Sequence, residues 1–331
     1  MKKLITAALA LLLAASLCLA EAPRKARGWR ADVPRAEMFL SDPAILADSA
    51  SQMYYMTGTS GLMWTSPDLE LWTGPYIVAR PDTSSWMGPR PEIWAAEPHK
   101  YNGRYYYFAT FTNNADTIGH YRDHYYPRRA SHVLTSDNPL GPYVPVSDEN
   151  YLPATRPTLD GTFWVDSDGK PYMVFCGEWL DNWNGTMERM ELKPDLSGPA
   201  SEPDTLFRAF DAPWSHEIID GKDCPSKVTD GPWLFRTATG RLGMIWTSWH
   251  DTVYTTGVAY SESGTLAGPW IQQKEPILSG YGHGMIFRDL TGRWLMSVHS
   301  HAKDASGRYV RKPQLFEVDL SGDALKVGSK L

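Results

Sequence analysis

An internal repeat constrains the fold of this chain more than any other feature. Five times, a short opening with an acidic residue or a histidine precedes an apolar run and then an aromatic-rich run. The openings are Ser41-Asp42-Pro43, Ala96-Glu97-Pro98, Leu159-Asp160-Gly161, Thr229-Asp230-Gly231 and Gly282-His283-Gly284. They recur at intervals of roughly 50–70 residues, the spacing of propeller blades or solenoid units.

The connections inside each repeat are typical of antiparallel hairpins. Turn-forming dipeptides stand between the first two runs of four repeats, at Asn102-Gly103, Asp168-Gly169, Thr239-Gly240 and Thr291-Gly292. No window holds a sustained 3.6-residue apolar period, which argues against a helical protein. We therefore predict an all-β chain, a five-bladed β-propeller that occupies residues 39–331 as a single domain.

The first twenty residues have the composition of a secretory signal peptide. A basic start, with Lys2 and Lys3, is followed by an apolar run that is too short for a membrane anchor. We expect cleavage after Ala20 and a secreted or periplasmic protein. Lipoprotein anchoring through Cys18 is the less favoured alternative, because Leu17 before it fits a lipidation site poorly. Residues 21–38 are polar and contain proline, and we predict a loosely held leader.

Charge and cysteine content narrow the partners. The formal net charge of −6 becomes −8 once Lys2 and Lys3 are removed, which disfavours nucleic acid and anionic membrane as partners. Cys176 and Cys224 remain after processing and could pair in an exported protein, although two cysteines are too few for a disulfide scaffold.

Propeller geometry brings the repeated openings together. The innermost strand of every blade starts near one shared axis, so three aspartates, a glutamate and a histidine should meet in one basin. The second strand of each blade returns to the same face, and its end should rim that basin. These ends are rich in polar and aromatic residues, among them Glu178, Trp179, Trp249 and His301. Carboxylates beside aromatic platforms indicate acid–base catalysis on a sugar.

The motifs, in this order, resemble glycoside hydrolase family 43, whose members are five-bladed propellers that act on arabinose-, xylose- or galactose-containing glycans. The resemblance spans the mature chain. It rests on Ser41-Asp42-Pro43-Ala44-Ile45, Trp94-Ala95-Ala96-Glu97-Pro98, Asp160-Gly161-Thr162-Phe163 with Asp166-Ser167-Asp168-Gly169-Lys170, and Gly282-His283-Gly284. It implies that Asp42 is the general base, that Asp160 raises the pKa of the acid and orients it, and that His283 is an axial residue beside a calcium ion or a water. No organic cofactor is implied, since the reaction needs only an acid, a base and water.

The general acid is where the chain departs from the family pattern. The family usually has a glutamate before Gly-Pro at the start of blade four, whereas this chain has Asp230 before Gly231-Pro232. Either Asp230 donates the proton, or Glu178 at the end of the second strand of blade three has taken over; Glu217 is a weaker candidate. Inverting glycosidases hold base and acid about 6.5–9.5 Å apart.

Sugar contacts are expected from Trp94, Glu97, Trp179 and Trp249. A stretch inserted in blade two, His120–Tyr126, is expected to be either a lid that shapes the pocket, which is the favoured alternative, or a solvated loop. Each acidic opening has a structural alternative, because Asp before Pro or Gly is commonly a turn residue.

The predicted function is removal of arabinofuranosyl, xylosyl or galactosyl-type residues from oligosaccharides or polysaccharides, with inversion. The alternative is a non-catalytic glycan-binding propeller that has lost its general acid. A sialidase-like enzyme is disfavoured, because the openings lack the arginines that such a site needs.

Overall fold

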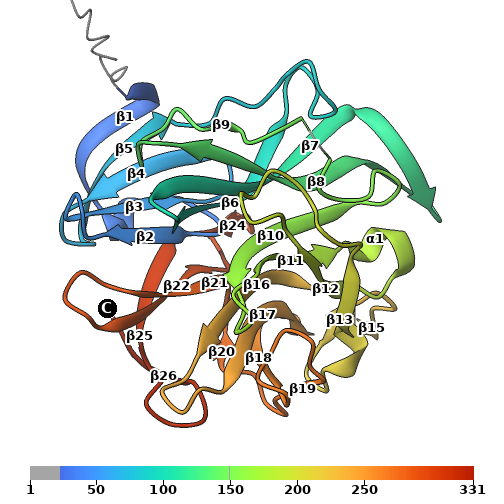
Figure 1. Ribbon diagram of the computed structural model, residues 1–331. Coiled ribbons are helices and arrows are strands. Elements are labelled where there is room, and N and C mark those ends of the chain that lie inside the picture. Colours follow the sequence, from blue (N-terminus) through green and yellow to red (C-terminus); the bar gives the residue numbers. More distant parts are fainter. Residues whose placement is uncertain (1–22, 149) are drawn as a thin grey trace, which may run out of the picture.

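The computed structural model describes residues 23–148 and 150–331, so the predicted signal peptide and Cys18 lie outside the described part. Five antiparallel sheets stand around a common centre, and each follows the chain from its innermost to its outermost strand (Figure 1). The prediction of an all-β, five-bladed propeller is confirmed. Within those residues, helix is confined to single turns at α1 (Trp179–Asn182), η1 (Arg35–Glu37) and η2 (Ala209–Asp211). No helix in the described part of the chain is long and apolar enough to cross a membrane.

The first three blades have four strands each in simple succession. Blade one contains β2 (Ala44–Asp48), β3 (Met53–Thr57), β4 (Leu62–Ser66) and β5 (Leu71–Ile77). Blade two contains β6 (Glu92–Tyr101), β7 (Arg104–Tyr121), β8 (His124–Ser136) and β9 (Val144–Pro145). Blade three contains β10 (Thr158–Val165), β11 (Pro171–Gly177), β12 (Thr186–Glu191) and β13 (Asp204–Arg208).

The last two blades carry additional short strands. Blade four contains β16 (Asp230–Arg236), β17 (Leu242–Asp251), β18 (Val253–Ser261) and β19 (Trp270–Gln272), with β14 (His216–Ile219), β15 (Lys222–Asp223) and β20 (Leu278–Ser279) at its margins. Blade five contains β21 (Tyr281–Arg288), β22 (Trp294–Ser300), β25 (Pro313–Asp319) and β26 (Lys326–Lys330). A separate hairpin, β23 (Ala302–Lys303) and β24 (Tyr309–Val310), extends from blade five.

The predicted loose leader is wrong for most of its length. Residues Arg24–Pro34 form β1, which pairs antiparallel with β5 as a fifth strand of blade one. The outer edge of β5 presents backbone N–H and C=O groups that need hydrogen-bond partners. The strand β1 supplies these partners, and the ladder between β1 and β5 contains two register shifts. The two prolines flanking this strand, Pro23 and Pro34, lie at its ends, where a missing N–H costs little. Val33 anchors the strand in the core.

Blades one and five close the ring through side chains, because no strand of the described chain is shared between their sheets. A common apolar cluster joins Ile45 and Met56 of blade one to Met285 and Leu295 of blade five. Polar contacts also cross this seam, including a 2.6 Å hydrogen bond that the Ser297 hydroxyl donates to the Pro43 carbonyl oxygen.

Tight packing between blades three and four depends on one glycine. The rings of Trp214 and Trp246 lie 4.7 Å apart, and Gly257 is paired with Trp246 across β17 and β18. A Cβ atom at position 257 would lie 2.0 Å from Cζ2 of Trp214. We expect Gly257→Ala to lower the free energy of unfolding by about 1–3 kcal/mol, because an overpacked core must shift. Urea titration measures this change. Gly322→Ala, where an added Cβ meets nothing within 4 Å, is the matched control, and an equal effect of both substitutions would contradict the packing argument.

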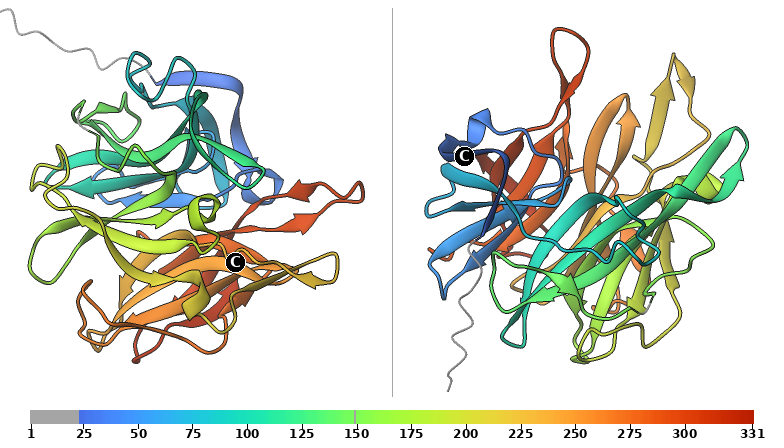
Figure 2. Two further views of the ribbon diagram at one scale, coloured as in Figure 1. Left: turned by 90° about the vertical axis from the view of Figure 1, so that its right-hand side faces the viewer. Right: turned by 90° about the horizontal axis from the view of Figure 1, so that it is seen from above.

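Hairpins project from one face of the propeller, seen pointing upward in the right-hand view of Figure 2. Among them are the tips of β7–β8, β14–β15 and β23–β24, from blades two, four and five. The β7–β8 and β23–β24 hairpins continue from the second strands of their blades, and the β14–β15 hairpin belongs to the connection before blade four. All three stand at the face where the innermost strands start. This face therefore has raised walls around its centre.

Candidate active site

A β-bulge opens the innermost strand in four of the five blades. The ladders shift register between Trp94 and Glu97, Leu159 and Thr162, Asp230 and Trp233, and Gly282 and Met285. One residue at each bulge has a left-handed backbone: Ala95, Asp160, Gly231 and His283 have φ between 42° and 57°. Asp42, directly before β2, shares this conformation with φ 58°. Such angles are uncommon for residues other than glycine and often mark functional positions.

Side chains of the neighbouring blade accept hydrogen bonds from the backbone N–H groups of these openings. In four cases the N–H group donates to a side chain one blade back. The acceptors are Thr59 Oγ1 for Ala95 (3.1 Å), Thr110 Oγ1 for Asp160 (2.8 Å), Thr247 Oγ1 for His283 (2.9 Å) and His299 Nδ1 for Asp42 (3.1 Å). Thr110, Thr247 and His299 lie on second strands, and Thr59 follows the second strand of blade one by two residues. The inter-blade bonds hold the opening of each innermost strand in place around the axis.

Four of the predicted site residues meet at this axis. Nδ1 of His283 lies 3.0 Å from Oδ1 of Asp230, 3.4 Å from Oδ1 of Asp42 and 3.8 Å from Oδ2 of Asp160. Asp160 and His283 are buried, and the side chain of Asp42 is only 10% exposed. One imidazole therefore faces three carboxyl groups that come from blades one, three and four.

The charges of this cluster are mutually dependent. Burial disfavours the imidazolium of His283, but the three carboxyl groups outweigh it and raise its pKa well above the usual value. Burial likewise disfavours ionisation of Asp42, yet the charge of His283 and the neighbouring imidazole of His299 lower the pKa of Asp42 to about 2. At neutral pH, His283 is a cation and Asp42 is a carboxylate.

The carboxyl groups of Asp160 and Asp230 interact directly, and the pKa of each depends on the other. Burial and the neighbouring negative charges raise the pKa of Asp160 well above its ordinary value. Asp230 is only partly buried, with its side chain 22% exposed, and His283 and hydrogen bonds from Asp160 and the Tyr254 hydroxyl hold its pKa below the usual range. Of the two carboxyl groups, Asp160 is therefore the one that takes up a proton first as the pH falls, and its Oδ2 also accepts the Gly231 N–H at 3.2 Å.

Glu178 occupies a different part of the same cavity. It directly follows β11 and is the residue before α1. Arg129 Nη1 contacts its two carboxylate oxygens at 2.6 and 2.5 Å, and the guanidinium also lies 4.0 Å from the ring centroid of Trp94. Burial raises the pKa of Glu178 even though Arg129 opposes that shift. Glu217 lies on β14, outside the lining of this cavity.

The cavity has a volume of about 390 Å³. Its lining joins the acidic residues Asp42, Asp160, Glu178 and Asp230 to three tryptophans, Trp94, Trp179 and Trp249. His283, His301, Tyr254 and Arg311 complete its polar surface. A concave site with aromatic faces and convergent polar groups suits a sugar, which presents both flat apolar ring faces and hydroxyl groups.

Glu97 is the predicted site residue that the structure places elsewhere. It is buried, bonded to His99 Nε2 at 2.9 Å and absent from the cavity lining. Ala95, not Glu97, has the left-handed conformation that corresponds to Asp160 and His283. Glu97 therefore lies two residues farther along its strand, where the side chain joins the core, and the expected sugar contact of Glu97 does not fit this position.

Several residues of the cavity carried no recognisable sequence motif. Tyr254 comes from the start of β18, a third strand, and bonds Asp230. Arg129 is on β8 and pairs with Glu178, while Arg311 comes from the connection between β24 and β25. These residues depend on third strands and an added hairpin, which the repeat of blade openings does not describe.

The residues around His283 are also the candidate metal site of the described chain. Ligand atoms of Asp160, Asp230 and His283 lie within 4.8 Å of one another. Calcium takes six to eight oxygen ligands, whereas this group supplies one nitrogen and two carboxyl groups. Nδ1 of His283 is at hydrogen-bonding distance from Asp230. This nitrogen therefore carries a proton, and the imidazolium itself supplies the positive charge that a metal ion would otherwise supply. A calcium ion held through Nδ1 does not fit this arrangement.

Two other sequence expectations concern the cysteines and the insertion in blade two. Cys176 and Cys224 are free thiols in the structure, the first buried beside the axis. The stretch His120–Tyr126 forms the tip of the β7–β8 hairpin, which packs on α1. The guanidinium of Arg122 lies 3.5 Å from the ring centroid of Trp183 there. This hairpin forms a side wall next to Trp179, whose ring meets the edge of His124 at 5.9 Å.

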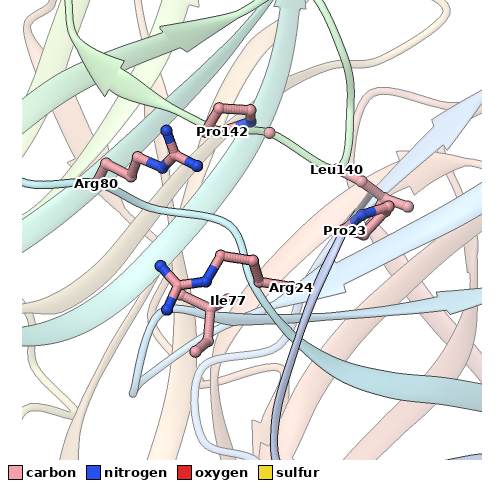
Figure 3. Close-up of a pocket in the computed structure, with 7 residues that line it drawn as sticks. Pro23, Arg24, Ile77, Arg80, Leu140 and Pro142 are labelled. Atoms are coloured by element: carbon pink, nitrogen blue, oxygen red, sulfur yellow. The ribbon is translucent and has the colours of Figure 1, made fainter. Parts of the chain in front are cut away.

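A small pocket, separate from the axial cavity, lies at the outer edge of blades one and two (Figure 3). It is lined by Pro23, Arg24, Ile77, Arg80, Leu140, Gly141 and Pro142. None of these residues has a carboxyl group, so this pocket lacks the acid and base of the axial site.

Comparison with known proteins agrees with the geometry. The model of glycosyl hydrolases family 43 matches residues 32–323. An endo-arabinase from Bacteroides thetaiotaomicron is 33% identical, with 86% of this chain and 96% of that chain covered at a TM-score of 0.73. None of the curated proteins with which the sequence was compared matches it.

Two more distant solved structures share the fold. An endo-1,4-beta-xylanase from Bacteroides thetaiotaomicron is 20% identical over 91% of this chain and 97% of that chain, with a TM-score of 0.69. An exo-1,5-alpha-L-arabinanase from a bovine ruminal metagenomic library is 18% identical over 88% of this chain and 97% of that chain, with a TM-score of 0.62. Given a family match over nearly the whole propeller and a convergent axial site, the chain belongs to glycosyl hydrolases family 43.

Proposed function

We propose that this glycoside hydrolase is an exported, inverting enzyme that acts on arabinofuranosyl, xylosyl or galactosyl-type residues. The observation that carries the proposal is the convergence of Asp42, Asp160 and Asp230 on His283, with Glu178 in the same tryptophan-lined cavity. Arabinan and xylan are the substrates named for similar structures. Export rests on the predicted signal peptide.

Asp42 is the proposed general base. Its low pKa keeps it ionised, and Thr59 and the backbone contact with His299 fix the direction of its carboxylate. An ionised, oriented carboxylate can accept a proton from water as that water attacks the anomeric carbon. The proton then resides on the carboxyl group of Asp42 until solvent removes it.

Glu178 is the proposed general acid, in preference to Asp230. An acid must be protonated when substrate binds, and burial raises the pKa of Glu178 whereas His283 and Tyr254 hold Asp230 ionised. The short separation of Asp230 from Asp42 also argues against Asp230. Asp230 and Asp42 contact one nitrogen at 3.0 and 3.4 Å, so their nearest oxygens are closer than the about 6.5–9.5 Å that inversion uses.

The remaining axial groups stabilise charge. Glycoside cleavage passes through a transition state that resembles an oxocarbenium ion. Asp230 has a lowered pKa and is ionised, like Asp42. Because Asp230 lines the cavity, its negative charge can stabilise the positive charge that develops on the sugar. Asp160, whose pKa is raised, holds Asp230 in place through their hydrogen bond.

Glu178→Gln and Asp230→Asn separate the two candidate acids. With an aryl glycoside whose leaving group needs little protonation, we expect Glu178→Gln to retain most turnover. On a natural oligosaccharide it should lose about 10²–10⁴-fold in kcat/KM, the usual contribution of a general acid. In wild type, activity should fall as the pH rises through the raised pKa of Glu178. Steady-state kinetics across pH measure both effects.

The outcome for Asp230→Asn discriminates between the assignments. If Asp230 stabilises charge, its loss should slow aryl glycosides and natural oligosaccharides by similar factors. A loss in Asp230→Asn that is confined to poor leaving groups, with an unchanged alkaline limb in Glu178→Gln, would return the acid role to Asp230. Glu217→Gln, altered outside the cavity, is the control.

A non-catalytic glycan-binding propeller is the competing function. The aspartate at position 230 motivates it, because the family places a glutamate there. Binding of oligosaccharides without turnover of any arabinofuranoside, xyloside or galactoside by wild type would favour that function.

A further inference from the structure

A second, larger cavity adjoins the axial site along the seam between blades one and five. Its volume is about 890 Å³. Residues before β2 and around β4 line one side, and the β23–β24 hairpin with the residues after it lines the other. Thr59 and Arg311 belong to the lining of both cavities. Because Thr59 also bonds the side chain of Asp42, this groove starts directly beside the proposed base.

The groove combines aromatic surfaces with positive charge. Phe39 is 72% exposed and Tyr309 is 48% exposed, and Trp64 of β4 belongs to the same lining. Three basic residues, Arg308, Arg311 and Lys312, share this lining with a single acidic one, Asp304. The groove therefore differs in charge from the axial cavity, whose lining includes four carboxyl groups.

Arg311 is the cation that remains available for a ligand. Arg308 is paired with Asp304 at 3.2 Å, and Lys312 donates to the Ala36 carbonyl oxygen at 2.8 Å. Arg311 is exposed and reaches only the Ser41 hydroxyl, at 3.5 Å. In the described part of the chain, no carboxylate lies within ion-pairing distance of its guanidinium. Its charge nevertheless reaches the axial cavity, because burial and Arg311 together lower the pKa of His301 to about 4.

We propose that this groove binds a sugar that carries a carboxylate, a uronic acid residue next to the glycosyl unit in the axial cavity, and that Arg311 recognises the carboxylate. A guanidinium pairs with a carboxylate through two parallel hydrogen bonds, which a neutral sugar cannot replace. Phe39, Trp64 and Tyr309 offer flat faces to the sugar rings. The proposal rests on the proposed function and names its substrate class as acidic, uronate-bearing glycans.

The test compares oligosaccharides that differ only in charge. Glucuronic-acid-substituted xylo-oligosaccharides and galacturonate-containing arabinogalactan oligosaccharides are paired with their carboxyl-reduced counterparts. Calorimetric titration into Asp42→Asn, which retains the groove, measures binding without turnover. We expect the acidic member of a pair to bind roughly fivefold or more tightly at low salt, with the difference shrinking as salt screens the exposed pair.

Variants of Arg311 assign the effect. Arg311→Gln, in the same Asp42→Asn background, should abolish the difference between acidic and reduced ligands, and Arg311→Lys should retain part of it. Arg104→Gln, which removes a half-exposed arginine paired with Asp137 at the β6–β7 turn, should leave the difference unchanged. Equal binding of acidic and reduced ligands, or a preference that survives Arg311→Gln, would overturn the uronate proposal alone. Absence of binding by every ligand would contradict the proposed function as well.

Discussion

Asp42→Asn should reduce kcat on every substrate by about 10²–10⁴-fold, the range that general base catalysis contributes. The amide has nearly the shape of the carboxylate and can still accept a hydrogen bond from Thr59, but it cannot take a proton from the attacking water. Because the base acts on water and not on the leaving group, activated aryl glycosides should lose as much activity as natural oligosaccharides. This pattern differs from the one expected for Glu178→Gln.

Steady-state kinetics and thermal unfolding measured together test the prediction. The unfolding midpoint should stay close to that of wild type, so that lost turnover cannot be attributed to lost structure. Asp137→Asn, an exposed aspartate paired with Arg104 far from the axis, is the matched control and should retain full activity. Turnover by Asp42→Asn at a wild-type rate would remove Asp42 from the mechanism.

His283→Gln should cost about 3–5 kcal/mol of folding free energy at neutral pH, because it leaves buried carboxylates without their cation. The shift of Asp42 from 3.8 to about 2 alone corresponds to roughly 2 kcal/mol. That contribution is present above pH 3.8 and disappears as the pH falls through about 2. The pKa of His283 is raised, so its own contribution is complete below about 6.5 and is lost as the pH rises through its folded value.

Urea unfolding at several pH values checks this prediction. The gap between wild type and His283→Gln should be widest in weak acid and narrow as the pH rises beyond the folded pKa of His283. Adding Asp230→Asn to His283→Gln should recover part of the lost stability, since it removes one of the uncompensated charges. A gap that does not change with pH would mean that His283 stabilises the fold only by packing.

The repeat of blade openings was sufficient to predict the architecture. Strand and turn patterns are local, and a period of roughly 50–70 residues with tight turns at equivalent places leaves a propeller as the natural arrangement. The same reasoning explains why Asp42, Asp160, Asp230 and His283 were predicted to meet, and the structure brings their side chains together at the axis.

The same reasoning did not place Glu97 or the residues before blade one. The bulge in β6 places Ala95 at the position equivalent to Asp160, and a bulge changes the direction of the side chains that follow it. Residues Arg24–Pro34 lack a strong apolar alternation, and they are ordered as a strand because the edge of β5 pairs with them.

The amino-acid sequence by itself determined the all-β fold, its five-part repeat and the family to which the chain belongs, because turns, strand periodicity and blade openings are encoded in neighbouring residues. Tertiary structure alone decided which carboxyl groups are ionised. The pKa values of Asp160, Asp230 and Glu178 depend on burial and on His283, Tyr254 and Arg129, which come from other strands and blades. Those electrostatic interactions act through space over a few ångströms, between residues that are far apart in the sequence: the axial hydrogen bond from the Asp42 N–H group to His299 Nδ1 spans 257 positions.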